Sequence, residues 1–281
     1  MCLVLASNAW AEIGVVTLVD GGARLLRGAT WYKLATGARV DDADIVEVSD
    51  RGQVQLEFAT GTIVNLVGPG QLYLGPAPAK GGPPVATLAA GWLKAVAKAP
   101  GLRIRMPPFE TLVPEGIVVA RADGALAAVF LESKTAKLVE LAPNGSDGAS
   151  REAKAGDYWT KTVGAAFTTA QSPPKAFVGA MPRHFVDALP TLAAKTKGKP
   201  PLVADRDITY AEAAPWLVGR DRIAFEKRFA SRLGDPAFRR SAEPDLSRHP
   251  SWDRIVHPEK YAPNDGPSPK DKPASKDKPA G

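Results

Sequence analysis

A hydrophobic alternation of period two, repeated in short runs over residues 12–181, constrains the fold of this chain more than any other feature. In one run Val54, Leu56 and Phe58 alternate with polar residues, which places the apolar side chains on one face of a strand. Gly, Pro, Asn and Asp interrupt the runs about every 8 to 12 residues. Helical periodicity is absent from this range. The pattern predicts a mainly β domain, an antiparallel β-sandwich or β-roll.

Dipeptides that contain Gly predict the turns between these runs. Thr60-Gly61 and Pro69-Gly70 are expected to turn the chain on either side of a strand at Thr62–Val67. Pro100-Gly101 is expected to form a two-residue hairpin turn. Further strands are expected at Gln71–Leu74, Trp92–Lys98, Leu102–Met106, Gly116–Ala122, Leu126–Glu132 and Lys137–Leu141.

Two short segments suggest a duplicated half within the β region. The segment Ala155–Trp159 near its end is similar to Asp42–Ile45 near its start. Short strands also resemble one another by composition alone, so both interpretations stay open.

Residues 182–262 carry signals for short helices instead. Thr209 and Glu212 have the spacing of a capping box. Asp221 is expected to cap a helix that starts at Arg222, and Gly234 is expected to end it. Aromatic residues at helical spacing are interpreted as a core that docks the helices onto the sheet, with a partner-binding stripe as the alternative; they are Trp216, Phe225, Phe229, Phe238 and Trp252.

The two ends of the chain have different compositions. Residues 1–11 place a short apolar stretch before Ala9-Trp10-Ala11, an A-x-A-like cleavage signature, and are interpreted as a truncated signal peptide; a first β-strand is the alternative. Cleavage there would remove Cys2, the single cysteine. Residues 263–281 repeat a Lys-Asp-Lys-Pro-Ala pattern and are expected to form a disordered tail. The expected location is periplasmic or secreted, and no run is long enough for a transmembrane segment.

An ordered series of residues resembles the FecR domain of bacterial envelope proteins. The series is Gly14-Val15-Val16, Gly37, Val40-Asp41, Asp44-Ile45, Val54-x-Leu56-x-Phe58, Thr60-Gly61-Thr62-x-Val64-x-Leu66 and Leu72-x-Leu74. The resemblance covers about residues 12 to 100 and implies an envelope-located binding module. Residues 210–261 resemble a tail found on some FecR-domain proteins. Ala43 and Thr60 depart from the usual Gly and Asp, and no anti-sigma or transmembrane part precedes the β region, so transmembrane signalling is not expected.

One group of residues is a candidate binding site for an anionic or glycan ligand. If Pro100-Gly101 forms a hairpin turn, Lys98 lies opposite Arg103 and Val96 lies opposite Arg105. The site would then gather Trp92, Lys94, Lys98, Arg103 and Arg105 on one face. Like charges in opposite positions favour a compensating anion. A carboxylate from a neighbouring strand, or a different register, is the alternative.

Other kinds of chemistry find no support in the sequence. The chain has no G-x-S-x-G motif and no phosphate-binding Gly-rich loop. His184, His249 and His257 lack the spacing of metal ligands. An acidic cluster at Asp41, Asp42 and Asp44 is interpreted as a solvated turn instead of a calcium site. We therefore expect no catalytic residues, no metal, no cofactor and no nucleic-acid partner.

These observations predict a non-enzymatic FecR-like module of the cell envelope, with a binding or signalling-associated role. Its expected partner is an envelope protein or a cell-wall or anionic glycan. One alternative is a hydrolase of envelope polymers that uses carboxylates such as Glu110, Glu115 or Glu132. Another is a structural subunit that pairs through exposed edge strands. The sequence does not indicate an oligomeric state.

Overall fold

The alternating runs form the strands of one large sheet in the computed structural model, which describes residues 12–76, 81–142, 146–196 and 198–261. The strands are β1 (Glu12–Asp20), β2 (Ala23–Arg27), β3 (Thr30–Lys33), β4 (Arg39–Asp41), β5 (Ile45–Val48), β6 (Gln53–Phe58), β7 (Ile63–Leu74), β8 (Val85–Ala97), β9 (Leu102–Met106), β10 (Phe109–Asp123), β11 (Leu126–Leu131), β12 (Thr135–Leu141), β13 (Asp147–Lys154), β14 (Tyr158–Thr162), β15 (Thr168–Ala170) and β16 (Val203–Asp207). The predicted mainly β fold is confirmed. The predicted signal peptide and tail lie outside the described residues.

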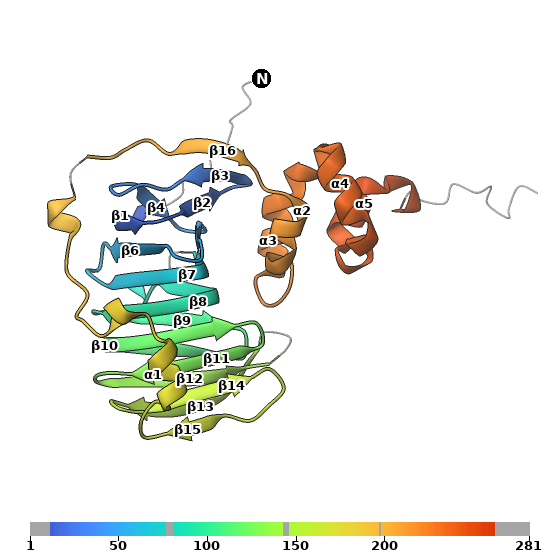
Figure 1. Ribbon diagram of the computed structural model, residues 1–281. Helices are drawn as coiled ribbons and strands as arrows, with labels where there is room; N and C mark the ends of the chain where they lie inside the picture. The colour runs from blue at the N-terminus through green and yellow to red at the C-terminus, as the bar shows by residue number, and fades with distance from the viewer. Residues whose placement is uncertain (1–11, 77–80, 143–145, 197, 262–281) are drawn as a thin grey trace, which may run out of the picture.

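The strands stack one above another in a roll (Figure 1). Their order is β15-β14-β11-β10-β9-β8-β7-β5-β2-β3-β16, with β6, β1 and β4 branching from β7 and with β12 and β13 branching from β10. Neighbouring strands are antiparallel except for β8 and β9, which are parallel. One apolar core contains residues from both halves of the chain's strands, from Val16 in β1 to Ala153 in β13. Val54, Leu56 and Phe58 lie in it, as their alternation predicts.

Strand β8 turns a corner partway along its length. Arg103 of β9 pairs with Val85 at the start of β8, although only a short link joins β9 to Ala97 at the end of β8. A straight strand of this length would separate its ends by about 40 Å, whereas the link reaches no more than about 20 Å. The strand must therefore bend, and Gly91, with a φ of 98°, marks the corner.

A similar irregularity replaces the turn expected at Pro69-Gly70. Strand β7 runs through this pair without reversing, and its pairing with β8 shifts register between Val67 and Gln71. The peptide bond before Pro69 is cis. The Pro-Gly pair therefore marks a bulge inside a strand, and the predicted turn is wrong.

Helical elements follow the sheet in two groups. The first is α1 (Lys175–Ala180), followed by η2 (Arg183–Phe185) and η3 (Ala193–Lys195). The second, here called the helical unit, comprises α2 (Tyr210–Ala213), η4 (Ala214–Trp216), α3 (Arg222–Phe229), η5 (Ala230–Gly234), α4 (Pro236–Ala242), η6 (Glu243–Arg248), α5 (Pro250–Val256) and η7 (Pro258–Tyr261). It lies beside the β2–β3 end of the sheet (Figure 1). Strand β16, between the two groups, was not expected. Across the described ranges, no helix has the length and apolar character needed to span a membrane.

A turn between β4 and β5 contains Asp44. The Asp41 N–H donates to Asp44 Oδ2 at 2.8 Å. The Ala43 N–H donates to the Leu74 carbonyl at 2.7 Å, and the Leu74 N–H donates to the Asp44 carbonyl at 2.8 Å. The turn is thereby fixed to the end of β7.

The turn between β13 and β14 repeats these bonds. The Lys154 N–H donates to Asp157 Oδ2 at 3.0 Å. The Gly156 N–H donates to the Leu131 carbonyl at 2.8 Å, and the Leu131 N–H donates to the Asp157 carbonyl at 3.0 Å. Ala43 and Gly156 occupy the same position with positive φ, 63° and 92°. The two segments therefore form the same local structure.

The strands around the two turns correspond as well. The neighbours β5-β7-β6-β1-β4 in the first half match β14-β11-β10-β12-β13 in the second half, and every pair is antiparallel. The chain order differs, because β6 and β7 end the first half whereas β10 and β11 begin the second. The two halves therefore share an arrangement of strands with permuted connections.

Candidate functional site

A groove of about 550 Å³ crosses the sheet where β7 and β8 have their irregularities. Its floor consists of small residues: Gly70, Ala90, Gly91 and Ala122. A Cβ on Gly91 would lie 2.7 Å from the Gly70 Cα and 2.8 Å from the Pro69 carbonyl oxygen, so a larger residue does not fit. The groove exists because glycines allow the strands to bend and leave the bend without side chains.

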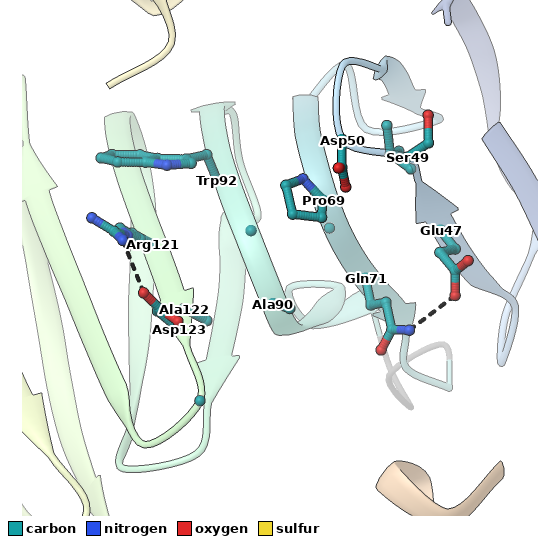
Figure 2. Close-up of a pocket in the computed structure, with 14 residues that line it drawn as sticks. Glu47, Ser49, Asp50, Pro69, Gln71, Ala90, Trp92, Arg121, Ala122 and Asp123 are labelled. Carbon is teal, nitrogen blue, oxygen red and sulfur yellow. Dashed lines mark hydrogen bonds and ion pairs between the residues drawn. The ribbon is translucent and has the colours of Figure 1, made fainter. Parts of the chain in front are cut away.

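One wall of the groove combines an aromatic ring with a charged pair (Figure 2). Trp92 of β8 lies opposite Arg121 of β10. The Arg121 Cζ is 5.2 Å from the centroid of the Trp92 ring, and the Arg121 Nη2 donates to Asp123 Oδ2 at 2.9 Å. Behind the wall, the Phe177 ring of α1 packs on Trp92 with the centroids 4.9 Å apart. The helix thus holds the indole in place.

The facing wall consists of polar side chains from β5 and β7 (Figure 2). The Gln71 Nε2 donates to Glu47 Oε2 at 2.9 Å, which leaves the Gln71 Oε1 as an acceptor. Arg24 holds the other oxygen of Glu47 from behind at 2.8 Å. Ser49 and Asp50 complete this wall. Both walls therefore offer fixed hydrogen-bonding groups on either side of an apolar floor.

The predicted hairpin at Pro100-Gly101 is wrong. Strand β9 pairs in parallel with the start of β8, so Arg103 lies beside Val85 and Arg105 beside Thr87. Lys98 lies in the exposed turn, where its carbonyl accepts from the Gly101 N–H at 2.7 Å. The five predicted site residues therefore do not form one site. The reason is the bend of β8. It places β9 beside the start of β8, whereas a two-residue hairpin turn would have placed β9 beside the end of β8.

Lys94 is buried, with an exposure of 2%. Its Nζ donates to Glu132 and to the carbonyls of Phe185 and Asp187. The carbonyls belong to a segment here called the strap (residues 182–196), which crosses the outer face of the sheet. Lys94 therefore holds the strap in place and does not point to solvent.

Two more buried side chains hold the strap from the sheet. The Gln55 Nε2 donates to the Pro190 carbonyl at 2.9 Å. Glu57 Oε1 accepts from the N–H groups of Leu192 and Ala193. In each case a polar side chain on the outer face of a strand contacts the strap backbone. The alternation correctly predicted that these side chains lie on the face opposite the core, but it did not predict that the strap covers them.

Arg103 and Arg105 are compensated by a carboxylate of the next strand. Both donate to Glu110 of β10, which is 3% exposed. Arg105 also contacts Asp221 of the helical unit at 3.2 Å. The alternative considered from the sequence, a neighbouring carboxylate, therefore describes their environment. Only Trp92, of the five, lines the groove.

The carboxylates considered for hydrolysis are separated. Glu110 pairs with Arg103 and Arg105, Glu132 pairs with Lys94, and Glu115 is exposed. None of the three lines the groove.

The three histidines have different surroundings. His249 is buried and its Nδ1 lies 2.9 Å from Glu226 Oε1. His257 lies near Glu259 at the surface. Burial lowers the pKa of His184. In the part of the chain that the structure describes, no group of three or more His, Cys, Asp and Glu residues could hold a metal ion.

The groove residues other than Trp92 were missed from the sequence. Arg121 and Asp123 lie on β10 and Gln71 lies on β7, so these side chains line one groove only through the register of the sheet. The available signal was the pair of glycines at 70 and 91, inside otherwise apolar runs, because such glycines often mark a bulge.

Comparisons with known proteins do not identify a family. No protein-family model matches the chain, and no curated protein matches it. Two crystal structures, each of a provisionally named anti-sigma factor from Parabacteroides distasonis, are similar to part of it. One has 11% sequence identity and a TM-score of 0.40, covering 48% of this chain and 64% of that chain. The other has 10% identity and a TM-score of 0.39, covering 46% and 59%. The chain thus spans less than two thirds of those proteins, and the FecR resemblance stays a prediction.

Proposed function

We propose that this protein is a non-catalytic binding module of the bacterial envelope that holds an uncharged polysaccharide in the groove between Trp92 and Glu47. The observation that carries the proposal is a groove with fixed donors and acceptors on two facing walls. Polyhydroxylated ligands need both kinds of group, and an aromatic ring adds an apolar contact. The predicted signal peptide supports the envelope location.

The groove has room for a chain of sugars. It extends over β5, β7, β8 and β10, which are successive neighbours. Three strand spacings amount to roughly 14 Å, which is longer than one sugar ring. The ligand therefore enters as an extended segment, with the bend in the sheet as its floor.

The charges of the groove favour an uncharged ligand over the anionic one expected from the sequence. Its lining contains the carboxylates of Glu47, Asp50 and Asp123 and a single basic side chain, Arg121. Arg121 is already paired with Asp123. A polyanion would meet like charges on both walls.

The hydrolase alternative has less support. A glycosidase needs one carboxyl group that donates a proton and a second that acts as base or nucleophile. Glu47 contacts Arg24 at 2.7 Å and Asp123 contacts Arg121 at 2.9 Å. Each of these carboxylates thus has a guanidinium as its partner, an arrangement that suits an ion pair more than a proton donor. Binding without cleavage is the better interpretation.

The structural-subunit alternative is also less favoured. Strand β16 pairs with β3 and forms the edge at one end of the sheet, where it exposes the charged residues Asp205, Arg206 and Asp207. At the other end of the sheet, β15 is short and consists of exposed Thr168, Thr169 and Ala170. Short polar edges resist pairing with another chain.

The test is binding of purified full-length protein to uncharged glucan and N-acetylglucosamine oligomers, with anionic polymers in parallel, measured by calorimetry. Gln71→Ala and Arg121→Ala remove one hydrogen-bonding group from each wall. Each lost bond is expected to weaken binding about 2- to 10-fold, and the double variant should weaken it by about tenfold or more. The matched controls are Gln171→Ala and Arg240→Ala, which change exposed residues outside the groove.

Three results would overturn the proposal. The first is the absence of binding to any uncharged oligomer, and the second is equal loss of affinity in the control variants. The third is the steady release of reducing sugar ends, which would favour the hydrolase.

A further inference from the structure

We propose that a second cavity, between the sheet and the helical unit, binds a small molecule with an apolar body and one terminal carboxylate. The cavity has a volume of about 370 Å³ and is separate from the groove, with no lining residue in common. Its size falls in the range of small-molecule sites in proteins, which begins at about 300 Å³.

The floor of the cavity is a row of residues in adjacent strands. Tyr73 of β7 pairs with Thr87 of β8, and Thr87 pairs with Arg105 of β9. Arg105 in turn pairs with Glu110 of β10. These side chains point to the outer face of the sheet, where the helical unit covers Tyr73 and leaves space above Thr87 and Arg105.

Aromatic rings form one wall. The Tyr73 ring lies 4.9 Å from Phe225 and 6.2 Å from Trp216, measured between centroids. Trp216 and Phe225 are 5.4 Å apart. The remaining lining is mostly aliphatic and comprises Ala89, Met106, Pro107, Leu141, Ala142, Val163, Pro215 and Val218. This surface suits an alkyl chain or an aromatic group.

The polar end of the cavity points to a carboxylate. The Arg105 Nη1 contacts Asp221 at 3.2 Å, and its other contacts are with Glu110. The Asp221 side chain is 31% exposed. It can therefore turn towards water when the carboxylate of a ligand replaces it as the partner of Arg105. Nearby, the Thr87 hydroxyl is buried and has no hydrogen-bond partner in the described structure. An acceptor on the ligand would satisfy it.

The rim of the cavity exposes apolar side chains that a ligand would cover. Val163 is 50% exposed and Val218 is 67% exposed. Val218 belongs to the loop 217–221, which closes one side of the cavity. Two ion pairs join this loop to the sheet region, Arg105–Asp221 and Arg220–Asp147. Exchange of Asp221 for a ligand would release one of them and let the loop open.

Decanoate, used below its micelle concentration, is a suitable probe, with decylammonium as its charge-reversed counterpart. Binding is measured by calorimetry and by tryptophan fluorescence, since Trp216 lines the cavity. We expect decanoate to bind and decylammonium to bind at least about tenfold more weakly, because the cavity lining carries two guanidinium groups, Arg105 and Arg220, against the one carboxylate of Asp221. Thr87→Val should weaken the binding of decanoate about threefold, because one hydrogen bond is lost.

A matched pair of valines separates this cavity from nonspecific binding. Val218→Asp places a charge at the rim of the cavity and should weaken the binding of decanoate about tenfold. Val186→Asp changes a valine of similar exposure on the strap, 75% against 67% for Val218, and should not change decanoate binding. Equal affinity for decanoate and decylammonium, equal effects of the two valine variants, or no binding of decanoate would each overturn the proposal.

Discussion

The two halves of the sheet share their strand arrangement and their Asp turn, yet different elements complete them. In the first half, the helical unit covers Tyr73 and Ile45. In the second half, α1 covers Phe130 and Tyr158, which hold the corresponding positions beside the Asp turn. Because both halves have the same strand arrangement, each half has an apolar outer face at the same place. Each half therefore needs a separate element to cover that face.

The chemistry of the two covers differs. The helical unit inserts Arg228, whose guanidinium donates to the carbonyls of Leu26, Gly28 and Ala43. Burial lowers the pKa of Arg228 to about 10. The other cover, α1, contributes the Phe177 ring, which lies 4.9 Å from the rings of Trp92 and Tyr158. The first half is therefore closed by a buried charge and the second by apolar contacts, so they should respond differently to mutation and to pH.

The largest expected effect comes from Arg228→Met, which removes the charge from the first cover. Three buried carbonyls then lose their donor, and we expect a loss of about 3–5 kcal/mol in the free energy of unfolding. Denaturant titration measures it. Arg239→Met, at an exposed position of the neighbouring helix α4, is the control and should change stability by less than about 0.5 kcal/mol. Equal effects of the two variants would contradict the role assigned to Arg228.

A smaller effect distinguishes the two Asp turns. Asp44 is fully buried, and Arg27 donates to both of its oxygens. Asp157 is half-buried and accepts from the Lys154 N–H. Asp44→Ala should lower the free energy of unfolding by about 2–3 kcal/mol, since Arg27 keeps only its contacts with Asp41 at 2.9 Å and with the Arg39 carbonyl at 3.1 Å. Asp157→Ala should lower the free energy of unfolding by about 1 kcal/mol. The measurement is denaturant titration of both variants, and a larger loss for Asp157→Ala would reverse the comparison.

The smallest effect concerns alkaline pH. Burial raises the pKa of Tyr73 to about 12, whereas an unfolded tyrosine ionises near about 10. Above this pH the unfolded chain loses a proton that the folded chain keeps. The stability that Tyr73 contributes is therefore fully present below about pH 10 and falls by up to about 1.4 kcal/mol per pH unit as the pH rises towards 12.

Tyr73→Phe should flatten this decline, which is measured as the unfolding free energy at about pH 9 and pH 11. Phe130→Tyr, at the corresponding position of the second half, should introduce a weaker decline because Phe130 is only half-buried. An unchanged pH profile for Tyr73→Phe would show that other groups cause the alkaline loss.

Much of the fold could be predicted because it depends on local patterns. The alternation in β6 identified its buried face, and the Thr209–Glu212 capping box is present in α2. The aromatic residues of the helical unit are core, as expected. Asp221 was expected to cap α3, but its carboxylate pairs with Arg105 instead. Helix capping is local, whereas Arg105 is distant in the sequence and its position depends on the bend in β8.

Of the residues that line the groove, only Trp92 was among the predicted site residues. The proposed grouping of Lys94, Lys98, Arg103 and Arg105 depended on a hairpin, and Pro-Gly pairs occur in bulges and corners as well as in hairpins. The permuted order of the second half also could not be predicted, because strand order depends on contacts between segments far apart in the chain.

The hydrogen bond from Arg228 to Leu26 joins residues 202 positions apart in the chain. At ordinary rates of synthesis, about 10–40 s separate the appearance of these two residues at the ribosome. During that interval the outer face of the β2–β3 hairpin, with Leu26 and Trp31, has no cover. The nascent chain therefore stays incompletely folded until its last helices emerge. During this delay a chaperone can bind the exposed apolar residues of the hairpin.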